Sequence, residues 1–249
     1  MSGHSKWSTI KRQKGANDAK RGALFTKVAR EIIVAAKMGG GDPDANYRLR
    51  LAIDKARSVN MPMDNIKRAV ERATGGGEGI EFEEILYEGY GPGGIAVLVE
   101  TQTDNKNRTA AEVRSVFTKA GGQLAGAGAV AWQFEQRGLI AVARAGIDAD
   151  EVALVAIDAG ADDIDTESDP IEVYTSPHDL QQVRADIEAA GVKVESAEIA
   201  MIAKNTIELD ASKARQALRL LESLEDLEDT QRVTANFDIP EEVFAEVAG

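Results

Sequence analysis

The chain has 249 residues with 29 Lys+Arg against 42 Asp+Glu, which gives a net charge of -13 and an isoelectric point near 4.7. It is long enough for two or three domains, and its lack of cysteine excludes disulfides, thiolate nucleophiles and cysteine zinc ligands. No apolar run approaches the roughly 20 residues that span a bilayer, and the N-terminus lacks the apolar segment of a secretory signal. We therefore expect a cytoplasmic protein without membrane contact.

Residues 17–74 are predicted to form a small helical domain. Apolar residues at helical spacing indicate a first helix from about Asn17 to Met38, with Asn17 as its N-cap. Three glycines follow, and Asp42–Pro43 is typical of a helix start with Asp as the cap and Pro at the first position. Met61–Pro62 ends this second helix, and a third helix leads into the TGGGEG linker.

Residues 80–138 change to the period of strands. FEEILYEGY (82–90) and IAVLVETQ (95–102) are predicted strands around GYGPGG, which we interpret as a hairpin turn because a strand, and not a helix, follows it. Thr109–Glu112 has the pattern of a capping box and predicts a helix start. The alternation of Val130, Trp132 and Phe134 predicts a further strand.

Residues 139–204 have the element order βαββαβ, which is that of the ferredoxin-like fold. Residues 205–249 then supply a helix and a strand that complete the sheet begun by residues 80–138. We therefore predict an α+β protein of three domains, with a helical domain followed by two ferredoxin-like α+β domains, the third inserted in the second. The predicted boundaries are 1–79 for the basic arm and helical domain, 80–138 plus 205–249 for the second domain, and 139–204 for the inserted domain.

The sequence offers little that could carry catalysis. Its two histidines, His4 and His178, lack the spacing of a metal site or a catalytic triad. No Walker A loop and no glycine-rich dinucleotide motif is present. Acidic pairs such as Asp162–Asp163 could bind Mg²⁺ but are more typical of the solvated surface of an acidic protein. We expect no enzyme activity, no catalytic residue, no cofactor, no metal site and no small-molecule substrate.

Charge is divided unevenly along the chain. Residues 1–72 hold 16 Lys+Arg and 7 Asp+Glu, a net of +9, whereas residues 73–249 hold 13 and 35, a net of -22. Cations on an extended arm that continues into a helix can follow a phosphate backbone and release its counterions. We therefore predict nucleic-acid contact by nine residues, with a solvated, solubilising tail as the alternative: Lys6, Trp7, Lys11, Arg12, Lys14, Lys20, Arg21, Lys27 and Arg30.

Trp7 either stacks on an exposed base or packs on its own domain. Further cations extend the positive surface over the helical domain, among them Arg48, Arg50, Lys55, Arg57, Lys67, Arg68 and Arg72.

TDNKNRT (103–109) joins a predicted buried strand to a predicted helix. Free N–H groups at a helix N-terminus favour anions, so four residues form a possible phosphate site: Asn105, Lys106, Asn107 and Arg108. Turn and capping chemistry by Asp104, Asn105, Asn107 or Thr109 is the competing interpretation.

Several long motifs stand in order along the chain, namely MSGHSKW, KGANDAKRGALFTKVAREI, MPMDNIKRA, YEGYGPGGIAVLVE, TDNKNRT and VRSVFTKAGG. Together they closely resemble the YebC/PmpR family, bacterial proteins with a relative that activates translation in mitochondria. The resemblance covers nearly the whole chain. It implies one helical and two α+β domains and cytoplasmic, DNA-binding transcriptional regulation, and for some members ribosome-associated relief of stalling. It implies no enzyme activity.

The predicted function is therefore regulation of gene expression through nucleic-acid binding. The first reading is a DNA-binding transcriptional regulator. The alternative is a translation factor that binds ribosomal RNA in the ribosome and relieves stalling. Both use the same cations, and the sequence leaves the choice between DNA and the ribosome open.

Overall fold

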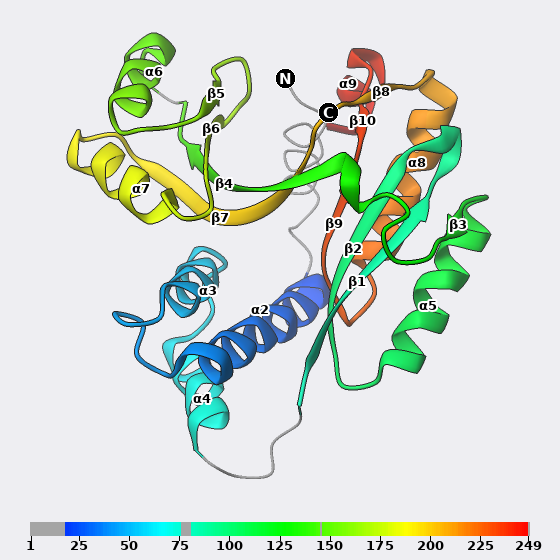
Figure 1. Ribbon diagram of the computed structural model, residues 1–249, viewed down its shortest axis with the longest axis horizontal. Coiled ribbons are helices and arrows are strands. Elements are labelled where there is room, and N and C mark those ends of the chain that lie inside the picture. Colours follow the sequence, from blue (N-terminus) through cyan, green and yellow to red (C-terminus); the bar gives the residue numbers. More distant parts are fainter. Residues whose placement is uncertain (1–17, 76–80, 145, 249) are drawn as a thin grey trace. The chain divides into compact units, whose positions relative to one another are not determined.

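The computed structural model describes residues 18–75, 81–144 and 146–248 (Figure 1). The described chain forms two compact units. The main unit contains residues 18–75, 81–132 and 209–235, and the inserted unit contains residues 133–144, 146–208 and 236–248. The helical region and the first sheet thus belong to one unit, and the three-domain boundaries drawn from the sequence stay a prediction.

Three helices open the main unit: α2 (Asp18–Gly39), α3 (Tyr47–Ser58) and α4 (Met63–Thr74). Their apolar faces meet in one cluster, in which Val28, Ile32, Leu49, Ala56 and Ile66 are almost completely buried. These positions recur at the helical spacing read from the sequence, which explains why the first and third helices were predicted close to their observed bounds. Asn17, the predicted N-cap of the first helix, lies outside the described residues.

The predicted start of the second helix at Asp42–Pro43 is wrong. Helix α3 begins at Tyr47, and its N-cap is Asn46, whose Oδ1 accepts a hydrogen bond from the backbone N–H of Leu49. The Asn46 amide also donates to the carbonyls of Ala35 and Gly40, so the same side chain caps α3 and ties it to the end of α2. Asp42 instead closes a turn, in which its Oδ1 accepts from the N–H of Asp44.

The sheet of the main unit has the strand order β3-β1-β2-β9, and its helices α5 and α8 lie against each other on one face of it (Figure 1). Its elements are β1 (Glu83–Tyr90), β2 (Ala96–Thr103), α5 (Lys106–Lys119), β3 (Gln123–Leu124), α8 (Ala211–Glu225) and β9 (Thr230–Ala235). The two long strands pair antiparallel from Glu83↔Thr103 to Tyr90↔Ala96, across the turn η1 (Pro92–Gly94). GYGPGG is therefore a hairpin connection, as predicted, and Gly93 adopts the positive φ of 80° that favours glycine there.

Of the strand predicted from Val130, Trp132 and Phe134, only Phe134 lies in a strand, as the first residue of β4 (Phe134–Val142), and the part around Val130 and Trp132 is wrong. Ala131–Gln133 forms the short turn η2, and Trp132 is 68% exposed. The reason lies in Glu88 of β1, whose buried carboxylate accepts hydrogen bonds from the backbone N–H groups of Gly128, Val130 and Ala131 at 2.5 to 2.7 Å. These bonds fix the segment as a loop over the sheet.

The inserted unit is a ferredoxin-like domain, as its element order predicted. Its four strands have the spatial order β5-β6-β4-β7 and all neighbours are antiparallel. Its elements are β4 (Phe134–Val142), α6 (Ala149–Asp158), β5 (Asp163–Asp165), β6 (Ile171–Thr175), α7 (Leu180–Ala189) and β7 (Val194–Ala203). A parallel pair, β8 (Ile207–Glu208) with β10 (Phe237–Asp238), and α9 (Glu241–Ala248) complete the unit. The strand predicted within residues 205–249 was VTANFDI (233–239), and the structure divides it at Asn236 between β9 and β10.

The two sheets share one plan in permuted chain order. In the main unit β2, α5 and β3 take the places of β4, α6 and β5, while α8 and β9 take those of α7 and β7. The strand that corresponds to β6 is β1, which comes before β2 in the chain, whereas β6 comes after β4. Each corresponding pair of neighbours is antiparallel in both sheets.

Candidate nucleic-acid interface

Four of the nine residues that were predicted to contact nucleic acid belong to α2, and their surroundings differ. Five lie outside the described residues, namely Lys6, Trp7, Lys11, Arg12 and Lys14. Lys20 belongs to α2, but its side chain is not described. Arg21 is exposed on α2, whereas Lys27 donates to the carbonyl oxygen of Glu225 and Arg30 is buried.

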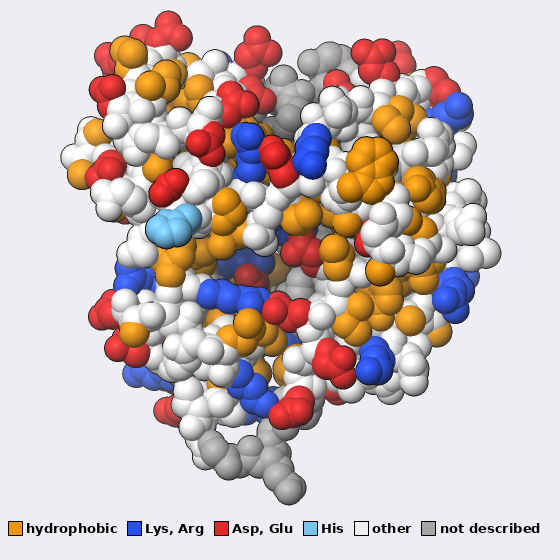
Figure 2. Space-filling view, in the orientation of Figure 1, with side chains coloured by type: hydrophobic (Ala, Val, Ile, Leu, Met, Phe, Trp, Pro, Cys, Tyr) orange, Lys and Arg blue, Asp and Glu red, His pale blue; other side chains and the backbone are white. Residues whose placement is uncertain are grey.

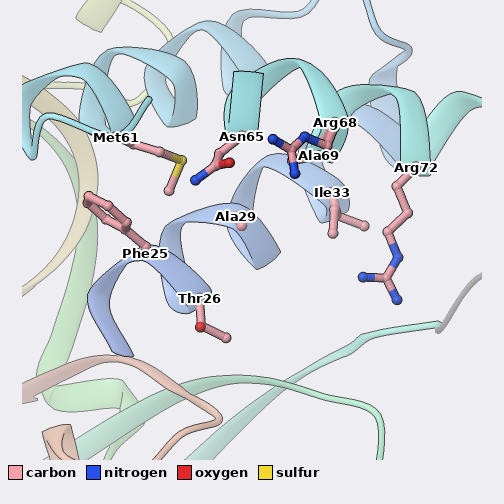
Figure 3. A pocket seen from close by; sticks show the side chains of 9 residues that line it. All are labelled: Phe25, Thr26, Ala29, Ile33, Met61, Asn65, Arg68, Ala69 and Arg72. Atoms are coloured by element: carbon pink, nitrogen blue, oxygen red, sulfur yellow. The ribbon is translucent and has the colours of Figure 1, made fainter. Parts of the chain in front are cut away.

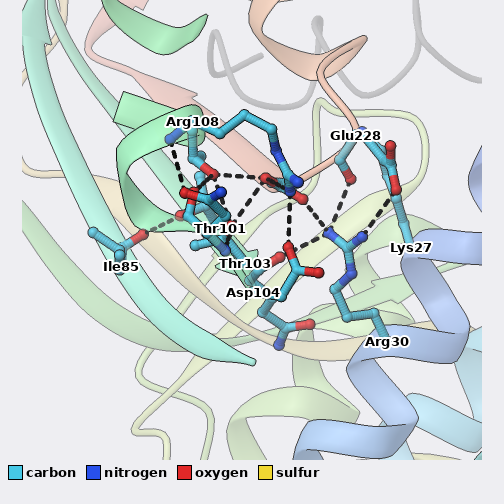
Figure 4. Close-up of polar contacts among 12 residues, drawn as sticks. Lys27, Arg30, Ile85, Thr101, Thr103, Asp104, Arg108 and Glu228 are labelled. Carbon is cyan, nitrogen blue, oxygen red and sulfur yellow. Dashed lines mark hydrogen bonds and ion pairs between the residues drawn. The ribbon is translucent and has the colours of Figure 1, made fainter. Parts of the chain in front are cut away.

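Arg30 is held inside the main unit, where α2 meets the sheet (Figure 4). Its side chain is 7% exposed and donates to Asp229 Oδ1 at 2.8 Å and to the carbonyl oxygen of Gln102 at 2.7 Å. The guanidinium also pairs with Glu228 and lies 4.8 Å from the centre of the Phe82 ring. Because these partners already satisfy it, Arg30 is not placed to bind a phosphate, and we leave it out of the proposed surface.

Asp229 is the centre of this buried cluster, with its side chain only 1% exposed. Besides Arg30 it accepts hydrogen bonds from the hydroxyls of Thr103 and Thr109 and from the Arg108 guanidinium, at 2.6 to 3.0 Å. Burial alone would raise the pKa of Asp229, but the hydrogen bonds from Thr109, Arg108 and Thr103 and the charge of Arg30 outweigh it and lower the pKa. Residue 229 is therefore an ionised carboxylate at neutral pH.

The TDNKNRT segment acts mainly in capping and in this cluster. Asn105 is the N-cap of α5, and its Oδ1 accepts from the N–H of Arg108 at 3.1 Å. Thr109, predicted to open a capping box, instead buries its hydroxyl against Asp229. The Arg108 guanidinium binds Asp229 and Asp104, and these hydrogen bonds raise its pKa.

The cap and the carboxylates occupy the groups that a phosphate at this helix start would use. Lys106 and Asn107 are both exposed, and Lys106 Nζ lies 3.8 Å from Glu83 Oε2. A phosphate site formed by Asn105, Lys106, Asn107 and Arg108 therefore stays a prediction, and the contacts of Asn105 and Arg108 speak for the turn and capping interpretation.

The cations of α3 are each paired with an acid of the main unit. Arg48 pairs with Glu84 of β1, Arg50 with Asp44, Lys55 with Glu31 and Arg57 with Asp54. Burial would raise the pKa of Glu84, but the hydrogen bonds from Arg48 and Gln102 lower it overall. In Figure 2 the blue side chains of Lys and Arg and the red side chains of Asp and Glu accordingly lie next to each other over α3.

Helix α4 is different, because its cations Lys67, Arg68 and Arg72 are exposed and make no ion pair within the described part of the chain. Arg68 and Arg72 border a groove of about 300 Å³ between α2 and α4 (Figure 3). Its other lining residues are Phe25, Thr26, Ala29, Ile33, Met61, Asn65 and Ala69. The sequence indicated the charge of this helix but not the groove, which depends on how two helices separated along the chain pack together.

The inserted unit is strongly acidic. Residues 133–208 hold 5 Lys+Arg and 17 Asp+Glu, and red side chains gather over α6 and β5 in Figure 2. Among the described residues no group of three or more His, Asp or Glu side chains could hold a metal ion. Within the same residues, every helix is too short or too polar to cross a membrane.

Comparison with known proteins places the chain in a family. Residues 5–76 match the TACO1/YebC protein N-terminal domain, and residues 82–237 match the TACO1/YebC second and third domain.

A probable transcriptional regulatory protein of Rubrobacter xylanophilus is 54% identical over 250 residues, with both chains fully covered. One of Dehalococcoides mccartyi is 56% identical over 98% of this chain and 97% of its own.

The crystal structure of a conserved hypothetical protein from Aquifex aeolicus has a TM-score of 0.85 and 46% identity, over 91% of this chain and 93% of that one. The chain therefore belongs to the TACO1/YebC family.

Proposed function

We propose that this protein is a regulator of gene expression that binds nucleic acid, with DNA as the favoured target, through cations of residues 1–72 other than Arg30 and the paired cations of α3. The observation that carries the proposal is the sorting of charge in the main unit. The cations of α3 are neutralised by partners, whereas Arg21, Lys37, Lys67, Arg68 and Arg72 are exposed and make no ion pair within the described part of the chain. The names of the relatives as probable transcriptional regulatory proteins support the same conclusion.

Binding of this kind is mainly electrostatic. Each phosphate that a lysine or arginine neutralises releases counterions, so affinity falls steeply with salt concentration, and phosphate contacts alone carry little sequence preference. The net charge of -22 on residues 73–249 repels the same polyanion. We expect the basic part to make the contact and the acidic part to limit how much of a duplex can approach.

The test compares two variants of the full chain that carry the same net charge. The first replaces five cations of the basic part by Gln, namely Lys11, Arg12, Lys14, Lys20 and Arg21. The control replaces five exposed cations of the remainder by Gln, namely Arg114, Lys119, Lys193, Lys213 and Arg219. Fluorescence anisotropy with a labelled DNA duplex, titrated at several salt concentrations, measures affinity and its salt slope. We expect a loss of at least about tenfold and a shallower slope for the first variant alone. Equal affinity of both variants would contradict the proposal.

A second candidate is a translation factor that binds ribosomal RNA in the ribosome. The acidity of residues 73–249 favours it, because a binding pocket bounded by both RNA and protein would accept a basic region while sparing the acidic remainder from a long duplex. Co-sedimentation with ribosomes at physiological salt, measured beside duplex binding at the same salt, separates the two candidates. Retention on ribosomes that the five-fold Gln variant loses, together with weak duplex binding, would favour the second.

A further inference from the structure

The groove between α2 and α4 combines an apolar floor with a basic rim. Phe25, Ala29, Ile33, Met61 and Ala69 form the floor, and Figure 3 shows Phe25 and Met61 together at one end. Of the described residues that line the groove, none is acidic. Its volume of about 300 Å³ lies at the small end of the range for ligand pockets.

Three of the polar side chains that line the groove lie along α4, and the fourth, Thr26 of α2, donates its hydroxyl to the carbonyl oxygen of Gly22. Arg68 and Arg72 are four residues apart on α4, so their backbone positions differ by about 6 Å along the helix axis. Both are exposed and make no hydrogen bond or ion pair within the described chain. Asn65, one turn before Arg68, brings a side-chain amide that can both donate and accept. Two positive charges that form no ion pair with a described carboxylate are complementary to an anion with repeated charges.

We propose that this groove binds an unpaired base of a single-stranded nucleic acid, with Phe25 as the stacking surface, Asn65 at the edge of the base and Arg68 and Arg72 on the flanking phosphates. The inference rests on the proposed function and names the form of nucleic acid that the site takes. A base in a duplex is stacked on both faces and cannot enter a pocket, whereas an unpaired base can leave the stack and lie on an aromatic side chain. An aromatic ring, an amide and two guanidinium groups supply the stacking, edge and phosphate contacts that such a base requires.

The first experiment uses the full chain and three labelled probes of one sequence, each prepared as DNA and as RNA. They are a single strand of about 12 nucleotides, the same strand with abasic sites in place of its bases, and the duplex. Base stacking is worth about 1 to 3 kcal/mol, which is a factor of about 5 to 150 in affinity. We expect the intact single strand to bind more tightly than the abasic strand by a factor in that range, and more tightly than the duplex.

The second experiment assigns the preference to the groove. We expect R68Q/R72Q to weaken single-strand binding by about tenfold or more and to reduce the salt slope by about 1.4, which corresponds to two phosphates of a single strand. The matched control R114Q/R219Q removes two exposed cations from α5 and α8 and should leave both quantities unchanged. N65A and A29M, which fills the floor, should abolish the preference for the intact over the abasic strand while keeping the salt slope. Urea unfolding confirms that each variant is folded.

The outcomes separate this inference from the proposed function. Equal affinity for intact and abasic strands, or a preference that N65A and A29M both retain, would overturn the base site while nucleic-acid binding through the basic surface stands. Displacement of the strand by an acidic peptide with an apolar side chain, but not by a free nucleotide, would also overturn it and assign the groove to a protein partner. If the wild-type protein bound none of the probes, the result would contradict the proposed function as well as the base site. A photo-crosslink from a 5-bromouracil probe to Phe25 or Met61 would support the site.

Discussion

Arg30 and Arg72 belong to neighbouring helices of the same region, yet their surroundings differ completely. Arg30 is buried, and its guanidinium is bound by Asp229, Glu228 and the carbonyl of Gln102. Arg72 is exposed at the rim of a groove and pairs with no described residue. One arginine therefore joins the helices to the sheet and the other is available to a ligand. In an acidic protein, the number of cations in a segment says less about binding than the number that the fold leaves without a carboxylate.

The largest expected effect separates these two roles by stability. Replacing Arg30 with Met removes one partner of a buried ion pair and leaves the charge of Asp229 with one fewer cation beside it. We expect the free energy of unfolding to fall by about 4 kcal/mol. The matched change Arg72→Met affects an exposed side chain and should alter the free energy of unfolding by less than about 0.5 kcal/mol. Urea unfolding of the two variants measures both values. Similar stabilities would show that the buried cluster does not hold the main unit together.

A smaller effect is expected at Glu88 of β1, whose carboxylate holds the loop of residues 128–131 by three hydrogen bonds. Glu88→Gln keeps the size of the side chain but exchanges a charged acceptor of three backbone N–H groups for an amide with one acceptor oxygen. We expect a loss of about 1 to 3 kcal/mol in the free energy of unfolding. Faster hydrogen exchange at Gly128, Val130 and Ala131 should accompany it. Unchanged exchange at these three amides would mean that other contacts hold the loop.

Acid should lower the free energy of unfolding through both Asp229 and Glu88. The pKa values of Asp229 and Glu88 are lowered in the folded protein, because hydrogen bonds to the carboxylates outweigh the effect of burial. A carboxylate with a lowered pKa stabilises the fold above its unfolded pKa of about 4, and this contribution is lost as the pH falls through the folded value.

We therefore expect the free energy of unfolding to be nearly constant between pH 7 and 5 as far as these groups are concerned, and to fall below about pH 4. In D229N the decline should be shallower, since one of the two groups no longer titrates. An equally steep decline in D229N would assign the acid sensitivity to other carboxylates.

The helix cap tests the alternative interpretation of the TDNKNRT segment. Asn105→Ala removes the acceptor for the N–H of Arg108 and should cost about 1 kcal/mol of stability. If the segment only caps α5, inorganic phosphate should raise the melting temperature of the wild type and of N105A by the same small amount. A larger phosphate effect that disappears in N105A or in Lys106→Gln would instead support an anion site.

The smallest expected effect is at the exposed pair of Arg48 and Glu84, which are about two-fifths exposed and join α3 to β1. A double-mutant cycle with Arg48→Gln and Glu84→Gln should give a coupling energy of about 0.2 to 1 kcal/mol that decreases with added salt. A coupling energy of several kcal/mol would mean that the exposed ion pair of Arg48 and Glu84 stabilises the fold as much as a buried one.

The order of elements was readable from the sequence because it depends on local patterns. Alternating apolar residues and turn residues predicted the ferredoxin-like order of residues 139–204, and helical periodicity predicted α2 and α4. The errors at Asp42–Pro43 and at Thr109 share one cause. Each of these residues is a good cap in isolation, but a competing side chain, Asn46 or Asn105, reaches the helix start in the folded chain.

The fate of individual cations was not readable in this way. Arg30 and Arg21 belong to the same predicted helix, and the partner that holds Arg30 in the interior is Asp229, which lies 199 residues further along the chain. The groove at Arg68 and Arg72 likewise depends on side chains of α2 and α4 that meet only after the helices pack. Sequence predicts how many charges a region carries, and tertiary contacts decide which of them remain available.

The chain order of its strands determines when the main sheet can be completed during synthesis. Strand β9, which pairs along β2, and helix α8, which covers the same face as α5, are translated only after the whole of residues 133–208. Until then β2 has an open edge, and Asp229 has not yet reached Arg30. The emerging chain can form the ferredoxin-like sheet of residues 134–203 first, while the sheet of the main unit still lacks β9. A nascent chain halted before Thr230 would thus expose a buried-type strand edge, which is the kind of surface that chaperones and other chains bind.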